Sequence, residues 1–331
     1  MHYDVFNGDA DGICSLVQLR LSSPKNSKLI TGVKRDISLL KKIRPVKQDS
    51  VTVLDISMKK NYQEVVDFLK LGVEIFYADH HQSGDLLIHE NFRSHINKSS
   101  NICTSLIINK YLSGEYQEWA VVGAYGDGME ESARIIANKA DLAKDDRNQL
   151  RLLGECINYN SYGTSEIDLL YHPSVLYKLL KRNYNPFDFI SNEADVYNKL
   201  LDSYCSDISK AKAISPEIED DNVSIVTLPD EPWSRRVIGV YANLLMYNNK
   251  NRAHVLMTLN KNKSYLVGVR APYNSRKKAD LLCSMFGGSG RRGAAGINNL
   301  LELDKNNFIK EFTKQFDTNK ITIYSSNTKL I

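Results

Sequence analysis

Along the first part of the chain, short apolar runs alternate with longer segments that have helical spacing. Tyr3–Phe6, Val51–Leu54 and Val73–Ala78 have the apolar, partly β-branched character of buried strands. Ile13–Leu21 and Tyr62–Leu71 place their apolar residues on one helical face. A strand–helix–strand–helix order predicts a parallel sheet with helices on both of its faces.

Other segments of this part are less regular. Lys28–Lys34 is predicted to be a strand and to be followed by a short basic helix that ends at Arg44. Residues 89–100 are polar and are predicted to form a loop, and Ile102–Tyr111 is predicted to be a helix. Trp119–Tyr125 is a further apolar run, and we group the acid that follows it with the strand ends.

The remainder of the chain changes character twice. Residues 144–201 have mostly helical spacing, and a linking helix is expected from about 191 to 213. The acidic, polar stretch 215–222 marks a domain boundary. We therefore divide the chain into an N-terminal domain (1–190), a linker (191–221) and a smaller C-terminal α/β domain (222–331).

The C-terminal domain is predicted to be a mixture of strands and helices with a glycine-rich segment, Gly287–Gly296. A hairpin turn is expected at Lys261–Lys263, and the last helix precedes a strand-like tail. The strands are predicted at Val223–Leu228, His254–Leu259 and Tyr265–Arg270, and the helices at Val237–Met246, Lys278–Phe286 and Lys305–Phe316.

Composition adds few constraints. The chain has 331 residues, of which 42% are hydrophobic and 25% charged, as is usual for a soluble globular protein of two domains. The net charge of +4 is too small to indicate nucleic-acid binding by itself. The five cysteines are scattered and are expected to be reduced thiols. The first residues resemble a strand rather than a signal peptide, and no apolar run reaches about 18 residues, so we expect a cytoplasmic protein without membrane spans.

Side chains able to bind a metal follow the predicted strands. Asp79, His80 and His81 end one apolar run, and carboxylates stand at comparable places elsewhere: Asp9, Asp11, Asp55 and Asp127. Helix caps for the first two acids and a surface turn for the last are the structural alternatives. Carboxyl ends of parallel strands meet at one edge of a sheet, where open α/β folds bind their ligands.

Four carboxylates gathered in one place repel each other, so such a site requires divalent cations. Oxygen ligands with one or two imidazoles suit manganese, magnesium or iron better than a structural zinc. The number of ligands suits two ions bridged by one carboxylate, the arrangement used for in-line phosphoryl displacement.

The glycine-rich segment offers a complementary anion site. Backbone amides around Gly288, Ser289 and Gly290 could line a phosphate, and Arg291 and Arg292 supply positive charge. A flexible surface turn is the alternative. Arg270, at the end of a predicted strand, is a second candidate ligand for the anion.

The motifs resemble, in order and approximate spacing, those of the DHH phosphoesterase superfamily. They are Asn7–Gly12, Asp55 after its strand, Asp79–His81 and Gly126–Gly128, and Gly287–Gly296 is similar to the glycine-rich motif of the DHH-associated domain. The resemblance covers nearly the whole chain. It implies a parallel α/β DHH domain, a linker helix and a smaller C-terminal domain, with the active site in the interdomain cleft.

The resemblance also implies two Mn²⁺ ions, with Mg²⁺ as the alternative ion. Asp9 and Asp55 would hold one ion, while Asp55 would bridge to a second ion held also by Asp11, His80 and Asp127. His81 would contact the scissile phosphate or donate a proton, and Asp79 would orient the histidines.

Two departures from the family pattern concern the ligands. Many members carry a histidine shortly before the first aspartate, where this chain has Val5, Phe6 and Asn7. The glycine-rich motif usually continues into a histidine, where this chain has Arg291.

The compact two-domain form is similar to nano-RNases and stand-alone dinucleotide phosphodiesterases. We therefore expect a manganese-dependent hydrolase of phosphoric esters that cleaves linear dinucleotides, such as pGpG, or very short oligoribonucleotides to 5′-mononucleotides. The alternatives are a 3′-phosphoadenosine 5′-phosphate phosphatase, a cyclic-dinucleotide phosphodiesterase and an inactive nucleotide-binding regulator. The sequence does not fix the oligomeric state, for which we consider a homodimer.

Overall fold

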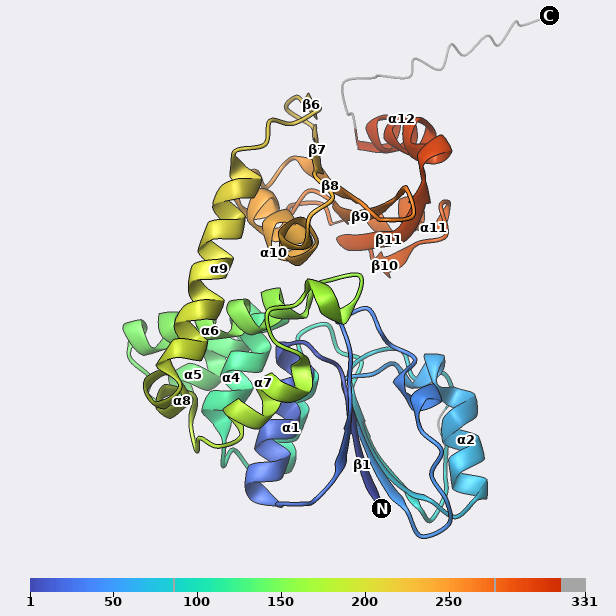
Figure 1. Cartoon of the computed structure of the whole chain (residues 1–331), viewed down its shortest axis with the longest axis vertical. Coiled ribbons are helices and arrows are strands. Elements are labelled where there is room, and N and C mark those ends of the chain that lie inside the picture. The colour runs from blue at the N-terminus through green and yellow to red at the C-terminus, as the bar shows by residue number, and fades with distance from the viewer. Residues whose placement is uncertain (86, 277, 317–331) are drawn as a thin grey trace, which may run out of the picture. The chain divides into compact units, whose positions relative to one another are not determined.

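The computed structural model describes residues 1–85, 87–276 and 278–316. Within them the chain forms two compact units, one from Met1 to Ser206 and one from Asp207 onward, and the division falls inside helix α9 (Ala194–Lys212). Both units combine a sheet with helices, so the predicted α/β class is confirmed (Figure 1). The tail predicted after Phe316 lies outside the described residues.

The first unit is built on a five-stranded, wholly parallel sheet in the order β2-β1-β3-β4-β5. Its central strands carry the apolar runs of the sequence, and almost all of their residues are buried. The strands are β1 (His2–Phe6), β2 (Lys28–Ile30), β3 (Ser50–Leu54), β4 (Glu74–Asp79) and β5 (Phe92–Ile96).

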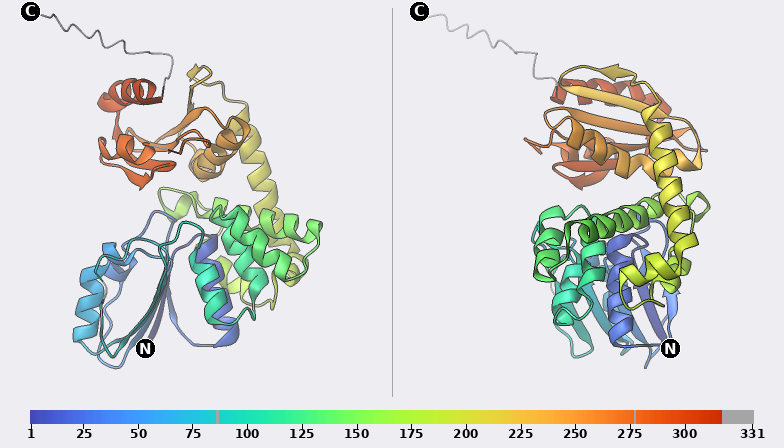
Figure 2. Two further views of the ribbon diagram at one scale, coloured as in Figure 1. Left: turned by 180° about the vertical axis from the view of Figure 1, so that it is seen from behind. Right: turned by 90° about the vertical axis from the view of Figure 1, so that its left-hand side faces the viewer.

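Helices cover both faces of this sheet because successive strand residues point to opposite sides. Phe6 packs with α1 and α4 in one core cluster, whereas Val5 packs with α2 in another. Figure 2 shows these two helical layers from behind, with the sheet between α1 and α2. The helices are α1 (Ala10–Ser22), α2 (Tyr62–Lys70), α3 (Thr104–Tyr111), α4 (Gln117–Gly126), α5 (Glu130–Lys139), α6 (Lys144–Ser161), α7 (Pro173–Leu180) and α8 (Pro186–Asn192).

A buried ionic group lies at the amino ends of the strands. The Asp4 carboxylate accepts hydrogen bonds from Arg20 Nε at 2.9 Å and Nη2 at 2.5 Å, and from Ser27 Oγ at 2.6 Å. His2 Nε2 lies 3.1 Å from the same carboxylate. Arg20 therefore ties helix α1 to strand β1 at the edge opposite the predicted site.

Four predicted elements differ from the structure. The basic helix expected before Arg44 is only a 3₁₀ turn at Leu39–Lys42, and the preceding strand ends at Ile30. The loop predicted at residues 89–100 contains β5, an edge strand whose polar side chains are tolerated because they are half-buried or exposed. Trp119–Tyr125 is part of helix α4.

The second unit contains a six-stranded sheet in the order β10-β11-β9-β8-β7-β6, in which only β7 and β8 are parallel. Helix α10 (Pro232–Asn248) packs on β8 and β9, and α11 (Ala279–Ser284) and α12 (Lys305–Phe316) contribute to the core of the other face. The strands are β6 (Ile218–Glu219), β7 (Val223–Leu228), β8 (Ala253–Leu259), β9 (Ser264–Arg270), β10 (Ser289–Arg291) and β11 (Ala294–Leu301).

The predicted hairpin at Lys261–Lys263 is confirmed, because β8 and β9 are antiparallel neighbours on either side of it. The glycine-rich segment is an antiparallel hairpin of β10 and the start of β11 rather than a loop. Among the described helices, none has the length and apolar character needed to cross a membrane.

Candidate metal centre

The carboxyl ends of β1, β3 and β4 lie side by side in the sheet. Phe6 is paired with Leu54, and Leu54 with Ala78. The pairing continues one residue further, since the Asp55 amide donates to the Ala78 carbonyl at 3.0 Å. The polar residues after these strands therefore reach one edge of the sheet.

Asp9 is both a helix cap and a member of the site. Its Oδ1 accepts a hydrogen bond from the Gly12 amide at 3.0 Å and caps α1, as the structural alternative had it. Glycine is required at position 12 because a Cβ atom would lie 2.3 Å from the Asn7 carbonyl oxygen. The second oxygen of Asp9 points away from the cap and accepts a hydrogen bond from Lys34 Nζ at 2.6 Å.

Asp11 joins two helices. Its carboxylate oxygens accept hydrogen bonds from the backbone amides of Thr104 and Ser105, both at 2.7 Å. These are the first two amides of α3, where the helix dipole stabilises negative charge. The fully buried Asp11 thus caps α3 from α1.

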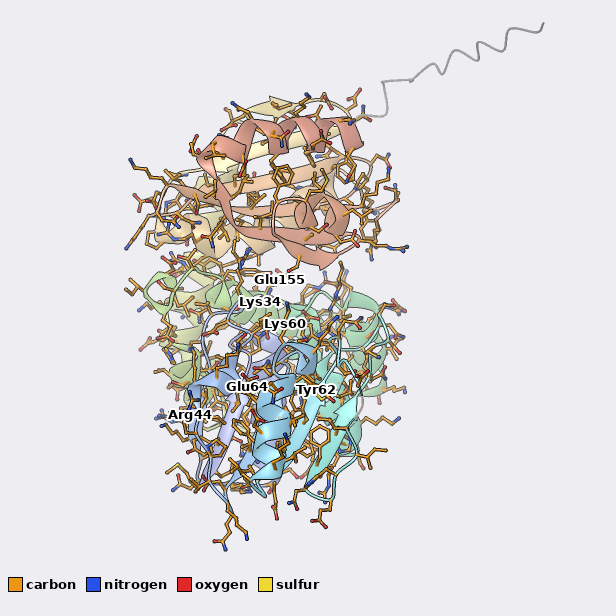
Figure 3. The ribbon with its side chains drawn as sticks, turned by 90° about the vertical axis from the view of Figure 1, so that its right-hand side faces the viewer. Lys34, Arg44, Lys60, Tyr62, Glu64 and Glu155 are labelled. Carbon is orange, nitrogen blue, oxygen red and sulfur yellow. The ribbon has the colours of Figure 1, made fainter. Side chains whose placement is uncertain are left out.

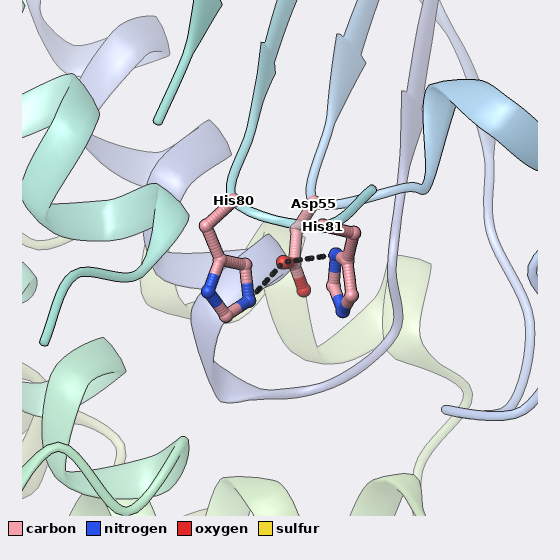
Figure 4. A group of neighbouring side chains, drawn as sticks. All are labelled: Asp55, His80 and His81. Atoms are coloured by element: carbon pink, nitrogen blue, oxygen red, sulfur yellow. Dashed lines mark ion pairs between the residues drawn. The ribbon is translucent and has the colours of Figure 1, made fainter. Parts of the chain in front are cut away.

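Asp55 lies at the centre of the group. Its φ of +60° is in the left-handed region, which aspartate tolerates better than most residues. Its Oδ1 accepts a hydrogen bond from Thr104 Oγ1 at 3.0 Å and lies 3.5 Å from His80 Nε2 and 3.8 Å from His81 Nδ1. Figure 4 shows the carboxylate between the two imidazole rings.

The two histidines are oriented by different partners. His80 Nδ1 lies 2.9 Å from the Ile102 carbonyl oxygen, so this nitrogen donates and Nε2 is directed at the carboxylates. His81 Nδ1 lies 2.7 Å from Asp79 Oδ1, and the His81 side chain is 38% exposed. The resemblance assigned the orientation of both histidines to Asp79; the structure gives this role to Asp79 for His81 and to Ile102 for His80.

Asp127 comes from a helix end and not from a strand end. It follows the last residue of α4, where Gly126 allows α4 to approach α1 so closely that a Cβ would lie 2.3 Å from Ala10 Cβ. Asp127 Oδ2 lies 3.7 Å from His80 Nε2. This buried oxygen has no hydrogen-bond partner among the described residues.

The donor atoms fit a divalent cation. Ligand atoms of Asp11, His80 and Asp127 lie within 4.8 Å of one another, as do those of Asp55, His80 and His81. Burial raises the pKa of Asp55 well above its usual value, and repulsion from Asp11, Asp9 and Asp127 raises it further. A buried, acid-rich group of carboxylates with an imidazole suits Mn²⁺ or Mg²⁺, which would relieve this repulsion.

Lys34 is a member of the group that the sequence analysis did not single out. Burial alone would lower the pKa of Lys34, but the Asp9, Tyr162 and Asp127 groups around it raise that pKa well above its usual value. Burial would raise the pKa of Asp9, and the ammonium of Lys34 lowers it. Lys34 ended a predicted strand, so applying the strand-end reasoning to cations would have found it.

The proposed anion ligands lie in the second unit. Arg291 and Arg292 are exposed in the β10–β11 hairpin, as are Ser289 and Gly290. The amide of Gly288 donates to the Cys283 carbonyl at 2.8 Å, so it is not available for an anion. Arg270 is buried and donates to Asn243 Oδ1 at 2.7 Å and to the Gly239 carbonyl at 3.2 Å.

No family model and no curated protein sequence matches this chain. Solved structures do. The exonuclease RecJ bound to manganese is 14% identical, with a TM-score of 0.61 over 95% of this chain and 90% of that one. The chain has the fold of the DHH phosphoesterases. The resemblance noted from the motifs is thereby confirmed at the level of the fold.

Two further DHH phosphoesterase structures match over most of the chain. The pGpG-specific phosphodiesterase PggH from Vibrio cholerae is 14% identical, with a TM-score of 0.56 over 95% of this chain and 99% of that one. RecJ from Thermus thermophilus, in complex with Mn²⁺, is 14% identical, with a TM-score of 0.62 over 95% of this chain. This chain spans about half of that exonuclease (52%).

Proposed function

We propose that the protein is a divalent-metal-dependent phosphodiesterase that hydrolyses linear dinucleotides, pGpG among them, or very short oligoribonucleotides to 5′-mononucleotides. The observation that carries this proposal is the gathering of Asp11, Asp55 and Asp127 around His80 in a DHH fold. Manganese is the expected ion. Two ions are implied by the resemblance, and the candidate ligands form two overlapping groups that share His80.

Different residues of the protein would have different roles in such a reaction. The four ligands would hold a cation, which when bound supplies Lewis-acid activation of water and neutralises charge on the phosphate. His81, held at Nδ1 by Asp79, would contact the phosphate or donate a proton to the leaving oxygen. Arg291 and Arg292 remain our proposed contacts for a terminal phosphate, with Ser289 and Gly290 beside them.

The extent of the match to PggH supports the dinucleotide substrate, because this chain spans 99% of that protein. A single-strand exonuclease is the second candidate, favoured by the TM-score of 0.61 to RecJ. A net charge of +4 gives little basic surface for a long polyanion, so we favour the short substrate.

The test is a side-by-side assay of the purified full chain with Mn²⁺. The substrates are pGpG, pApA, 5′-phosphorylated RNA and DNA of increasing length, cyclic di-GMP and 3′-phosphoadenosine 5′-phosphate, with products separated by chromatography. We expect fast conversion of dinucleotides to mononucleotides and a steep decline with length. Faster turnover of the bisphosphate, of the cyclic dinucleotide or of long DNA would select that alternative instead, and tight nucleotide binding without turnover would identify a regulator.

His80→Ala and His81→Ala are expected to separate metal binding from proton transfer. His80→Ala should reduce both bound manganese and activity, because its Nε2 faces Asp55 and Asp127. His81→Ala should retain the metal and lower kcat by about 10²–10⁴-fold. Metal content measured by mass spectrometry, beside kcat, checks this; loss of the metal from His81→Ala would make His81 a ligand. His89→Ala, at an exposed histidine away from the group, is the matched control.

Metal binding is expected to stabilise the first unit. A ligand that binds only the folded state at 100 times its dissociation constant adds about 2.7 kcal/mol. Thermal unfolding with Mn²⁺ and with a chelator should therefore differ by several degrees for the wild type and by little for Asp127→Asn. Equal shifts in the two proteins would exclude Asp127 as a ligand.

A further inference from the structure

The ammonium group of Lys34 lies among three oxygen atoms of the candidate metal centre. Lys34 Nζ is 2.6 Å from Asp9 Oδ2, 2.9 Å from Asn158 Oδ1 and 3.7 Å from Asp127 Oδ1. The ammonium therefore donates hydrogen bonds to the first two oxygens and forms an ion pair with the third. The Tyr162 ring lies 5.6 Å from the same nitrogen. The Lys34 side chain thus lies within the site rather than extending into solvent. Figure 3 labels this residue in the first unit.

The main chain fixes Lys34 at this place as well. The Lys34 amide donates to the Ser161 carbonyl at 2.9 Å, at the C-terminal end of α6. The Lys34 carbonyl accepts a hydrogen bond from Asn7 Nδ2 at 3.4 Å, from the first motif itself. Asn158 lies on α6, so one helix holds both the backbone and the side chain of Lys34.

The surroundings of Asp9 differ from the first metal site that the resemblance implies. Val5 and Phe6, which stand where many members of the superfamily have a histidine, are fully buried in two apolar clusters. Each carboxylate oxygen of Asp9 already accepts one hydrogen bond, since one oxygen caps α1 and the other binds Lys34. A cation at Asp9 and Asp55 would have to displace an ammonium that already neutralises Asp9.

We propose that this protein binds one divalent cation, at Asp11, Asp55, His80 and Asp127, and that the Lys34 ammonium replaces a second cation beside Asp9. The inference rests on the proposed metal-dependent function. Lys34 supplies a single, permanently attached positive charge at the point where the resemblance implies an ion. The protein's metal requirement is then one ion per chain.

Manganese stoichiometry of the metal-free full chain tests this, using equilibrium dialysis with mass spectrometry and electron paramagnetic resonance. We expect one Mn²⁺ per wild-type chain, with the six-line spectrum of an isolated ion. Two ions of comparable affinity with an exchange-coupled spectrum would overturn the inference and leave the proposed function standing. No bound ion would overturn both.

Variants at position 34 show whether the lysine is the group that excludes the second ion. Lys34→Gln removes the charge and should admit a second Mn²⁺, giving two ions per chain. Lys34→Arg keeps the positive charge and should still bind one Mn²⁺. This variant separates the loss of charge from other effects of a substitution at this position. Lys70→Gln, at an exposed lysine of α2, is the matched control and should bind one ion. A folded Lys34→Gln protein that binds a single ion would overturn the role of Lys34.

Discussion

Asp55→Asn is expected to lower hydrolysis by at least about 10³-fold and to abolish tight manganese binding. Asp55 lies beside both histidines, and its carboxylate charge is central to the ligand group. Asparagine is the right replacement because it keeps the shape of the side chain and tolerates the φ of +60° better than alanine does. Turnover and metal content of the same preparation measure the effect, with Asp67→Asn on the exposed side of α2 as control.

The same substitution is expected to stabilise the metal-free protein. Burial and neighbouring carboxylates raise the pKa of Asp55 above its ordinary value of 3.8, so the folded state retains this proton at a higher pH than the unfolded state does. Stability is therefore lost as the pH rises from about 4 through the folded pKa, and a neutral asparagine side chain at this position would not suffer that loss. We expect a gain of about 1–2 kcal/mol at pH 8 that vanishes near pH 4.

Urea unfolding in the presence of a chelator measures this gain. The chain has two tryptophans, and Trp119 is fully buried in the first unit, so its fluorescence in a Trp233→Phe background reports that unit alone. Equal stability of the two proteins at pH 8 would contradict the electrostatic strain inferred for the metal-free site.

Arg20→Met is expected to destabilise the first unit by about 3–5 kcal/mol, the usual effect of leaving a buried charge without its partner. Asp4 is fully buried and its charge is balanced by Arg20. The double variant Asp4→Asn/Arg20→Met should recover much of the loss, because the uncompensated charge is then absent. Arg44→Met, at an exposed arginine, is the control and should change stability little.

The effect of Arg20→Met should depend on pH with a defined sign. Burial by itself would raise the pKa of Asp4, but hydrogen bonds from His2 and Arg20 hold it at about 2, below its ordinary value of 3.8. The wild type therefore keeps this stabilisation above about pH 4 and loses it as the pH falls through about 2. The difference between the wild type and Arg20→Met should shrink over that range, and a constant difference would show that lost packing causes the effect.

The parallel sheet and most ligands of the candidate centre could be predicted because each depends on local pattern. Strand runs that end in acids or histidines mark the carboxyl edge of the sheet, and β1, β3 and β4 deliver Asp9, Asp55 and His80 there. Asp127 was predicted from a strand end, whereas the structure has it at the end of helix α4. Helix α4 is buried on nearly all sides, so its apolar run carries no helical period that would distinguish it from a strand.

The hydrogen-bond partners of the site residues could not be predicted from the sequence, because the two residues of each pair are distant along the chain. Asn158 lies 124 residues from Lys34, and Thr104 lies 93 residues from Asp11. Asn158 occurs in a helix whose pattern gave no sign of a function. The backbone carbonyl of Ile102 has no signature in side-chain identity at all.

The start of α3 also carries a consequence for dynamics. Its amides at Thr104 and Ser105 are bonded to Asp11, and the Ile102 carbonyl to His80, so the segment is anchored through groups that would touch the cation. Binding of manganese should therefore slow deuterium uptake more strongly at these amides than at the amides of the parallel sheet. The helix start would thus report occupancy of the centre in an experiment that needs no substrate.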